Sequence, residues 1–173
     1  MRPVRRLFAV ATLVTGLIAP AVATAPLALA ADDYPYRSDT SWSADPYGFT
    51  KRQCVSFAAV RLAQHRHAIN NSQRWGSAYH WDEAARSRGV AVSTRPVVGA
   101  IAQWHAGERS SFFANGSRTV NGWVQAGGFG HVAYVSAVYA DGSVAVEQYN
   151  MNGARSYSTM HVKAPRYLYV GVR

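Results

Sequence analysis

Residues 131–150, HVAYVSAVYADGSVAVEQYN, give the clearest indication of the fold. Two runs rich in β-branched and aromatic residues, His131 to Tyr139 and Val144 to Asn150, flank the pair Asp141-Gly142. An Asp-Gly pair between two such runs is a strong hairpin signal, because both central residues of a type I′ turn need positive φ. These residues therefore predict a two-stranded antiparallel hairpin.

Further predicted elements on both sides of the hairpin indicate an α+β domain. Val98 to Trp104 and Tyr167 to Val172 have the composition of strands. Upstream, apolar residues recur three and four positions apart from about Arg52 to Ile69, and Gly76 to Arg88 is a second helical stretch. The segment between His105 and Gly130 contains five glycines and is expected to be a long loop that shapes a cleft. Helices that come before an antiparallel sheet are typical of the α+β class.

Residues 1–30 are expected to be a secretory signal peptide. Basic residues at the start are followed by an apolar stretch from Leu7 to Ile18 and by Ala28-Leu29-Ala30, which fits an A-x-A cleavage site. The apolar stretch is too short for a membrane anchor. Cleavage after Ala30 would leave 143 of the 173 residues, enough for one domain. We expect an extended lead-in over 31–48 and one folded domain over 49–173.

Composition and charge exclude several classes of protein. The chain is 49% hydrophobic, so it can build a core, and only 16% of its residues are charged, against about 25% on average. Its net charge of +9 would fall to +6 without the signal peptide. The basic residues are scattered, and no nucleic-acid-binding motif accompanies them. We therefore expect no nucleic acid partner, and the net positive charge favours weak attraction to an anionic surface.

The single cysteine, Cys54, has surroundings that favour a reactive thiol over an inert one. Exported proteins often form disulfides, but a single cysteine has no partner in its own chain with which to form one. It lies in the first turn of the first predicted helix, where free N–H groups and the helix dipole favour an anion, and Lys51 and Arg52 add positive charge. These conditions predict a lowered thiol pKa.

A thiol nucleophile needs a base, and His131 is the best candidate among six histidines. It opens a predicted strand directly after Gly127-Gly128-Phe129-Gly130, where little side-chain bulk obstructs access. The other five histidines have no neighbours that indicate chemistry. Four aspartates in the lead-in are not spaced as a calcium-binding loop, and we expect no metal and no cofactor.

An ordered set of motifs resembles the CHAP family of cysteine, histidine-dependent amidohydrolases and peptidases. The set spans roughly residues 46 to 153 and is much more specific than any one of its parts. It consists of Arg52-Gln53-Cys54-Val55-Ser56-Phe57, Trp75-Gly76-Ser77-Ala78 before Trp81, Pro96-Val97-Val98-Gly99-Ala100-Ile101-Ala102-Gln103-Trp104, Gly130-His131-Val132-Ala133-Tyr134-Val135, Asp141-Gly142-Ser143 and Val146-Glu147-Gln148-Tyr149-Asn150.

The resemblance implies a papain-like fold with N-terminal helices packed on an antiparallel sheet, peptidoglycan as substrate, Cys54 as nucleophile and His131 as base. The chain departs from the family pattern at two positions. Ala100 stands where the family commonly has aspartate, and Gln148 stands where it usually has glutamate. These departures give some weight to a rival interpretation, a non-catalytic wall-binding module that kept the fold.

The residue that orients His131 depends on the hairpin register. A two-residue Asp141-Gly142 turn places Gln148 and Asn150 on the His131 face, because side chains alternate with a period of two. A loop of three residues would place Glu147 there instead. The Asp-Gly signal favours Asn150 or Gln148 as the orienting residue, with Glu147 as the rival. A neutral amide can hold an imidazole through its carbonyl oxygen.

The predicted chemistry is amide hydrolysis through a thioester. Cys54 would attack the carbonyl, His131 would move the proton, and the side chain of Gln53 would add a donor to the oxyanion site formed at the Cys54 backbone N–H. The expected protein is a secreted monomer that is extracellular or bound to the wall and has no membrane contact after signal cleavage. The bond that it cuts is left open between the N-acetylmuramoyl-L-alanine amide and amides of the peptide stem or cross-bridge.

Overall fold

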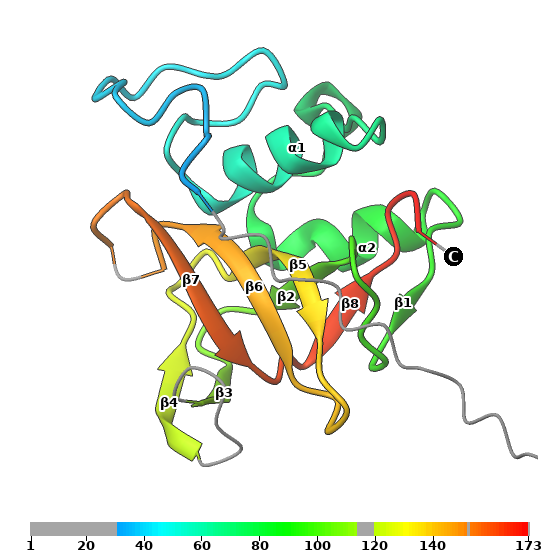
Figure 1. Ribbon diagram of the computed structural model, residues 1–173. Helices are drawn as coiled ribbons and strands as arrows, with labels where there is room; N and C mark the ends of the chain where they lie inside the picture. The colour runs from blue at the N-terminus through cyan, green and yellow to red at the C-terminus, as the bar shows by residue number, and fades with distance from the viewer. Residues whose placement is uncertain (1–30, 114–119, 152, 173) are drawn as a thin grey trace, which may run out of the picture.

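A computed structural model describes residues 31–113, 120–151 and 153–172. Its core is an eight-stranded antiparallel sheet with the strand order β1-β8-β2-β5-β6-β7-β3-β4, and helices α1 and α2 precede all eight strands in the sequence (Figure 1). The predicted signal peptide at residues 1–30 lies outside the described residues. The helices are α1 (Cys54–Gln64), α2 (Trp81–Arg86) and the short 3-10 helices η1 (Asn71–Gln73) and η2 (Ala78–His80). The strands are β1 (Val92–Ser93), β2 (Ile101–Trp104), β3 (Arg109–Phe113), β4 (Val120–Gln125), β5 (His131–Val138), β6 (Val144–Tyr149), β7 (Tyr157–Val162) and β8 (Arg166–Leu168).

The antiparallel sheet with preceding helices agrees with the predicted α+β class. The prediction of a long loop between His105 and Gly130 is wrong. This segment contains β3 and β4, which pair with each other, and β3 also pairs with β7. The polar start of β3 and the many glycines concealed the hairpin. One glycine is required for the packing of this pair, since a Cβ on Gly122 would lie 2.8 Å from the ring of Phe112.

The first helix is shorter than predicted at both ends. It begins at Cys54, because Arg52 has a φ of 59° and cannot continue a right-handed helix. It ends at Gln64, and Arg66 has a φ of 67°. The apolar spacing continues past this point to Ile69, which is buried, so periodicity alone overestimated the length. The helix start thus places the cysteine at the first helical position.

Alternating side chains place two hydrophobic clusters on opposite sides of the central strands. Ile101 and Val132 belong to the cluster under the helices, together with Leu62 of α1 and Trp81 of α2. The residues that alternate with these along each strand point to the other side of the sheet and belong to the second cluster, for example Ala133. Helix α1 packs against β5 and β6, the two strands of the central hairpin. Figure 1 shows α1 lying across this part of the sheet.

The segment over 31–48 packs against α1 and the sheet. Tyr34 is fully buried, and its hydroxyl is 2.5 Å from the hydroxyl of Ser56 in α1. The hydroxyl of Tyr149 donates to Asp32. Ser56 also donates to Asp45, so two parts of this segment hold the same helical residue.

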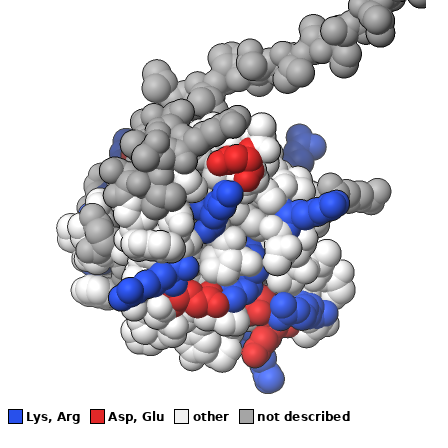
Figure 2. Space-filling view, turned by 90° about the horizontal axis from the view of Figure 1, so that it is seen from below, with Lys and Arg blue, Asp and Glu red and all other residues white. Residues whose placement is uncertain are grey.

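Positive and negative charges are mixed on the face of the molecule that Figure 2 shows. Figure 2 shows lysines and arginines spread over one face, with acidic residues between several of them. Such a distribution differs from the continuous basic stripe that accompanies nucleic-acid binding. Within the described ranges, no helix is long and apolar enough to cross a membrane.

Candidate active site

Cys54 lies where the central hairpin opens. The paired positions of β5 and β6 end at Tyr134 and Glu147; from there β5 runs on to His131 beside β2, and β6 runs on beside β7. The backbone N–H of Val132 is directed to the sulfur of Cys54, as are the N–H groups of Val55 and of Cys54 itself. The cysteine is therefore held next to the strand position that follows His131.

The prediction of a lowered pKa for the Cys54 thiol is wrong. Burial raises the pKa, and the three backbone N–H groups, which favour the thiolate, only partly oppose this effect. The two positively charged side chains that precede Cys54 interact with other groups. Lys51 forms an ion pair with Asp39 at 2.6 Å, and Arg52 donates from Nε to the backbone carbonyl of Arg155. The resting thiol is consequently neutral at pH 7.

His131 and Gln148 form a buried hydrogen-bonded pair. The distance from His131 Nε2 to Gln148 Oε1 is 2.9 Å, and the two residues are 3% and 1% exposed. Gln148 Nε2 donates to the hydroxyl of Ser158, which leaves Oε1 as the acceptor for the imidazole. In the neutral ring the proton is then on Nε2, and Nδ1 keeps a lone pair. Such a ring can act as a base through Nδ1.

Burial lowers the pKa of His131 from 6.5 to about 4, although the hydrogen bond with Gln148 raises it in part. Desolvation disfavours the imidazolium because the charge would be removed from water. At neutral pH both the imidazole and the thiol are therefore uncharged.

The stability of the protein is expected to fall as the pH drops from about 6.5 towards 4. In this window the unfolded chain binds a proton at His131 that the folded chain does not bind, so the free energy of unfolding rises with pH by up to about 1.4 kcal/mol per unit. Urea unfolding at steps between pH 7 and 4.5 measures the slope. The variant His131→Gln should have a shallower slope, and an unchanged slope would contradict the lowered pKa.

A β-bulge determines which side chain of β6 faces His131. The backbone N–H of Tyr139 bonds to the carbonyl of Ser143, so the turn has three loop residues rather than the predicted two. The pair Val138–Val144 continues this register, but the pairing shifts by one residue between Val135 and Ala137. The three-residue turn shifts the pairing by one residue and would turn the other face of β6 towards His131. The bulge at Ser136 shifts the pairing by one more residue and so returns the original face. Gln148 faces His131, as predicted, although the assumed pairing was wrong.

Asn150 contacts Gln53 and not His131. Its Oδ1 accepts from the backbone N–H of Arg155 at 2.8 Å, and its Nδ2 donates to Gln53 Oε1 at 2.7 Å. A backbone N–H can only donate, so this contact fixes the orientation of the Asn150 amide and hence that of Gln53. The NH₂ group of Gln53 is turned away from Asn150 and can donate to another acceptor.

Glu147 is on the opposite side of β6 and contacts α1. Its carboxylate pairs with Arg61 at 2.5 Å, and Arg61 also pairs with Asp33 of the N-terminal segment. Both Glu147 and Arg61 are largely buried. This placement removes Glu147 from the candidates for contact with His131 and gives it a role in holding the helix to the sheet.

In the part of the chain that the structure describes, five non-glycine residues have positive φ, and three of them meet around Gln53. They are Arg52, Asn150 and Arg155, with φ values of 59°, 60° and 47°. Residues held in this region cost free energy, and they cluster at functional sites when the surrounding contacts determine them. Arg155 was missed in the sequence because no local motif marks it; the hydrogen bonds of its side chain are with residues more than a hundred positions away.

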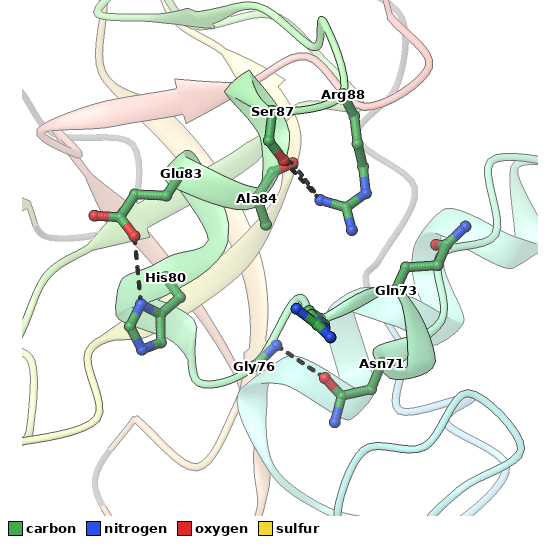
Figure 3. Close-up of a pocket in the computed structure, with 9 residues that line it drawn as sticks. Asn71, Gln73, Gly76, His80, Glu83, Ala84, Ser87 and Arg88 are labelled. Carbon is green, nitrogen blue, oxygen red and sulfur yellow. Dashed lines mark hydrogen bonds and ion pairs between the residues drawn. The ribbon is translucent and has the colours of Figure 1, made fainter.

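An open pocket of about 550 Å³ lies apart from this site, between η1 and α2. Figure 3 shows Arg88, in the turn that follows α2, projecting over the pocket, with Gln73 and Asn71 on the opposite wall. Neither Cys54 nor His131 lines it. The pocket adjoins η2, whose Tyr79 backbone N–H bonds to Phe129 two residues before His131.

Comparisons with known proteins point to one family. A family model described as a CHAP domain matches residues 42–150. The N-acetylmuramoyl-L-alanine amidase sle1 of Staphylococcus epidermidis is 32% identical over 106 residues, which is 61% of this chain and 26% of that protein. The same-named amidase of Staphylococcus aureus is 31% identical over 106 residues, 61% of this chain and 25% of that protein.

A solved structure is similar as well. The crystal structure of an N-acetylmuramoyl-L-alanine amidase from Staphylococcus aureus superposes with a TM-score of 0.56 and 25% sequence identity, over 79% of this chain and 36% of that chain. The present chain spans about a quarter of the length of the curated relatives that it matches.

Proposed function

Because the chain belongs to the CHAP domain family, we propose that it is a peptidoglycan hydrolase that cleaves an amide bond, with Cys54 as nucleophile and His131 as general base. The main support is the buried hydrogen bond between His131 and Gln148, one residue along the strand from the N–H group that meets the Cys54 sulfur. Gln148 acts as the residue that orients the imidazole.

The first step transfers a proton and forms a thioester. Both groups are uncharged at rest, since burial raises the thiol pKa and lowers the imidazole pKa. Nδ1 of His131 takes the thiol proton as sulfur attacks the amide carbonyl, and the imidazolium returns this proton to the leaving amine. Water then attacks the thioester, His131 takes a proton from it, and a carboxylate leaves as the thiol is restored.

The developing oxyanion needs donors, and the start of α1 supplies them. The Cys54 backbone N–H is one candidate. The second is the NH₂ group of Gln53, which Asn150 leaves free. Donors aimed at the oxyanion contribute about 10²–10³ in kcat. In this scheme Asn150 is a positioning residue for Gln53.

Peptidoglycan is proposed as the substrate because the matched relatives carry the name N-acetylmuramoyl-L-alanine amidase. The chemistry fits this amide and equally the amides of the peptide stem or cross-bridge. We further propose that residues 1–30 direct secretion, that 49–173 form a papain-like catalytic domain, and that 31–48 brace it. The enzyme would act as a monomer outside the cell or on the wall, where its net positive charge favours binding.

The proposed function is tested by mass spectrometry of the soluble fragments that the purified protein releases from peptidoglycan. Hydrolysis at the muramoyl amide yields sugar-free peptides with a new alanine amino terminus, and cleavage within the stem yields shortened muropeptides. A non-catalytic wall-binding module, the rival function, would sediment with the wall and release nothing. That result would overturn the proposed hydrolysis.

A further inference from the structure

Trp42 is exposed and yet held in place. It is 69% exposed, and the guanidinium of Arg155 lies over its ring at 4.0 Å from the centroid. An arginine on one face of an indole leaves the other face open to a ligand. Exposed large aromatic side chains that are fixed in this way are typical of binding sites, since little conformational entropy is lost when they bind.

Arg155 is fixed by the backbone around it. Its terminal nitrogens donate to the carbonyl groups of Thr40, Ser41 and Lys51, and Ser41 precedes Trp42. The terminal nitrogens are thus engaged with the protein itself. The side chain serves to hold the loop that carries Trp42 and does not offer its charge to a substrate.

The same residue connects Trp42 to the candidate active site. The backbone N–H of Arg155 bonds to Asn150, which bonds to Gln53, the residue before Cys54. The backbone carbonyl of Arg155 accepts from Arg52. Trp42 therefore lies on the side of the site from which α1 begins, and its placement depends on the contacts that orient Gln53.

We propose that the open face of Trp42 binds the apolar face of a sugar ring of the glycan strand, next to the amide that Cys54 attacks. Pyranose rings present a row of C–H groups that can stack on the face of an indole. This inference rests on the proposed function and narrows its substrate, because a bound sugar beside the scissile bond selects the muramoyl amide over amides farther along the peptide.

Binding is measured in a Cys54→Ala background, so that no ligand is consumed. A disaccharide-peptide and the same peptide without sugars are titrated, and the indole N–H resonance of Trp42 is followed by NMR. Trp42→Ala should weaken binding of the disaccharide-peptide about tenfold and leave the sugar-free peptide unchanged, while Trp42→Phe should retain most of the affinity. The matched control is Trp123→Ala on β4, because Trp123 is also 69% exposed.

An equal loss for both ligands, no loss with Trp42→Ala, or the same loss with Trp123→Ala would each overturn the proposal. The result is separate from hydrolysis. If the wild-type protein releases nothing from peptidoglycan while its disaccharide binding depends on Trp42, the sugar site stands and the hydrolytic function fails.

Discussion

Replacing Cys54 with alanine is expected to abolish release of fragments from purified peptidoglycan, with a fall in rate of at least about 10⁴-fold. The variant lacks the atom that forms the thioester, and removal of one member of a nucleophile and base pair costs nearly as much as removal of both. His131→Ala should therefore show a loss of similar size. Release of soluble fragments over time, with mass spectrometry of the products, measures the effect.

The matched control is Val55→Ala. Val55 and Cys54 are both partly buried against the same hydrophobic cluster, so truncation of either removes similar packing, but only Cys54 carries chemistry. Both variants should melt within a few degrees of the wild-type protein, and Val55→Ala should keep its activity. A folded Cys54→Ala protein that still cleaves peptidoglycan would exclude the thioester mechanism.

Replacing Asn150 with aspartate is expected to lower kcat by about 10²-fold, with a much smaller change in KM. One carboxylate oxygen can still accept from the N–H of Arg155. The other oxygen replaces the NH₂ group that donates to Gln53, and a carboxylate oxygen can only accept a hydrogen bond. Gln53 must then turn its NH₂ group towards Asp and present its oxygen to the substrate. The site loses a donor and gains a repulsive oxygen where negative charge develops.

A double-mutant cycle separates this role from a general loss of structure. In a Gln53→Ala background, Asn150→Asp should have little further effect on kcat, because the group that it misorients is already absent. Thermal melting of each variant reports any change in stability. Equal losses of kcat in the two backgrounds would show that Asn150 acts without Gln53.

Local signals in the sequence were sufficient to locate the two strands of the central hairpin but not their register. The Asp-Gly pair between β-rich runs marked β5 and β6. The predicted two-residue turn was wrong, and Gln148 lies on the His131 face because the bulge at Ser136 compensates for the longer turn. Features that depend on distant contacts were not accessible. The length of α1 depends on positive φ at Arg52, and that residue is held by contacts with Tyr34 and Arg155. No apolar pattern encodes such contacts.

The pKa of Cys54 illustrates the same limit. Its position at a helix start was predicted correctly, and the local argument for a thiolate followed from it. Burial against the cluster under the helices has the larger effect and raises the pKa. Likewise, the placement of Asn150 beside Gln53 required knowledge that β5 and β6 separate beyond Tyr134.

The bulge at Ser136 has a consequence for how relatives of this chain can diverge. The three-residue turn and the extra residue in the strand each invert the faces of β6, and together they leave the pairing of His131 with Gln148 intact. A deletion of one residue in either place alone would direct Glu147 towards the imidazole and move Gln148 to the helix side. Insertions and deletions in this hairpin should therefore occur in compensating pairs, and an alignment that allows gaps only in the turn will assign the wrong residue to the histidine.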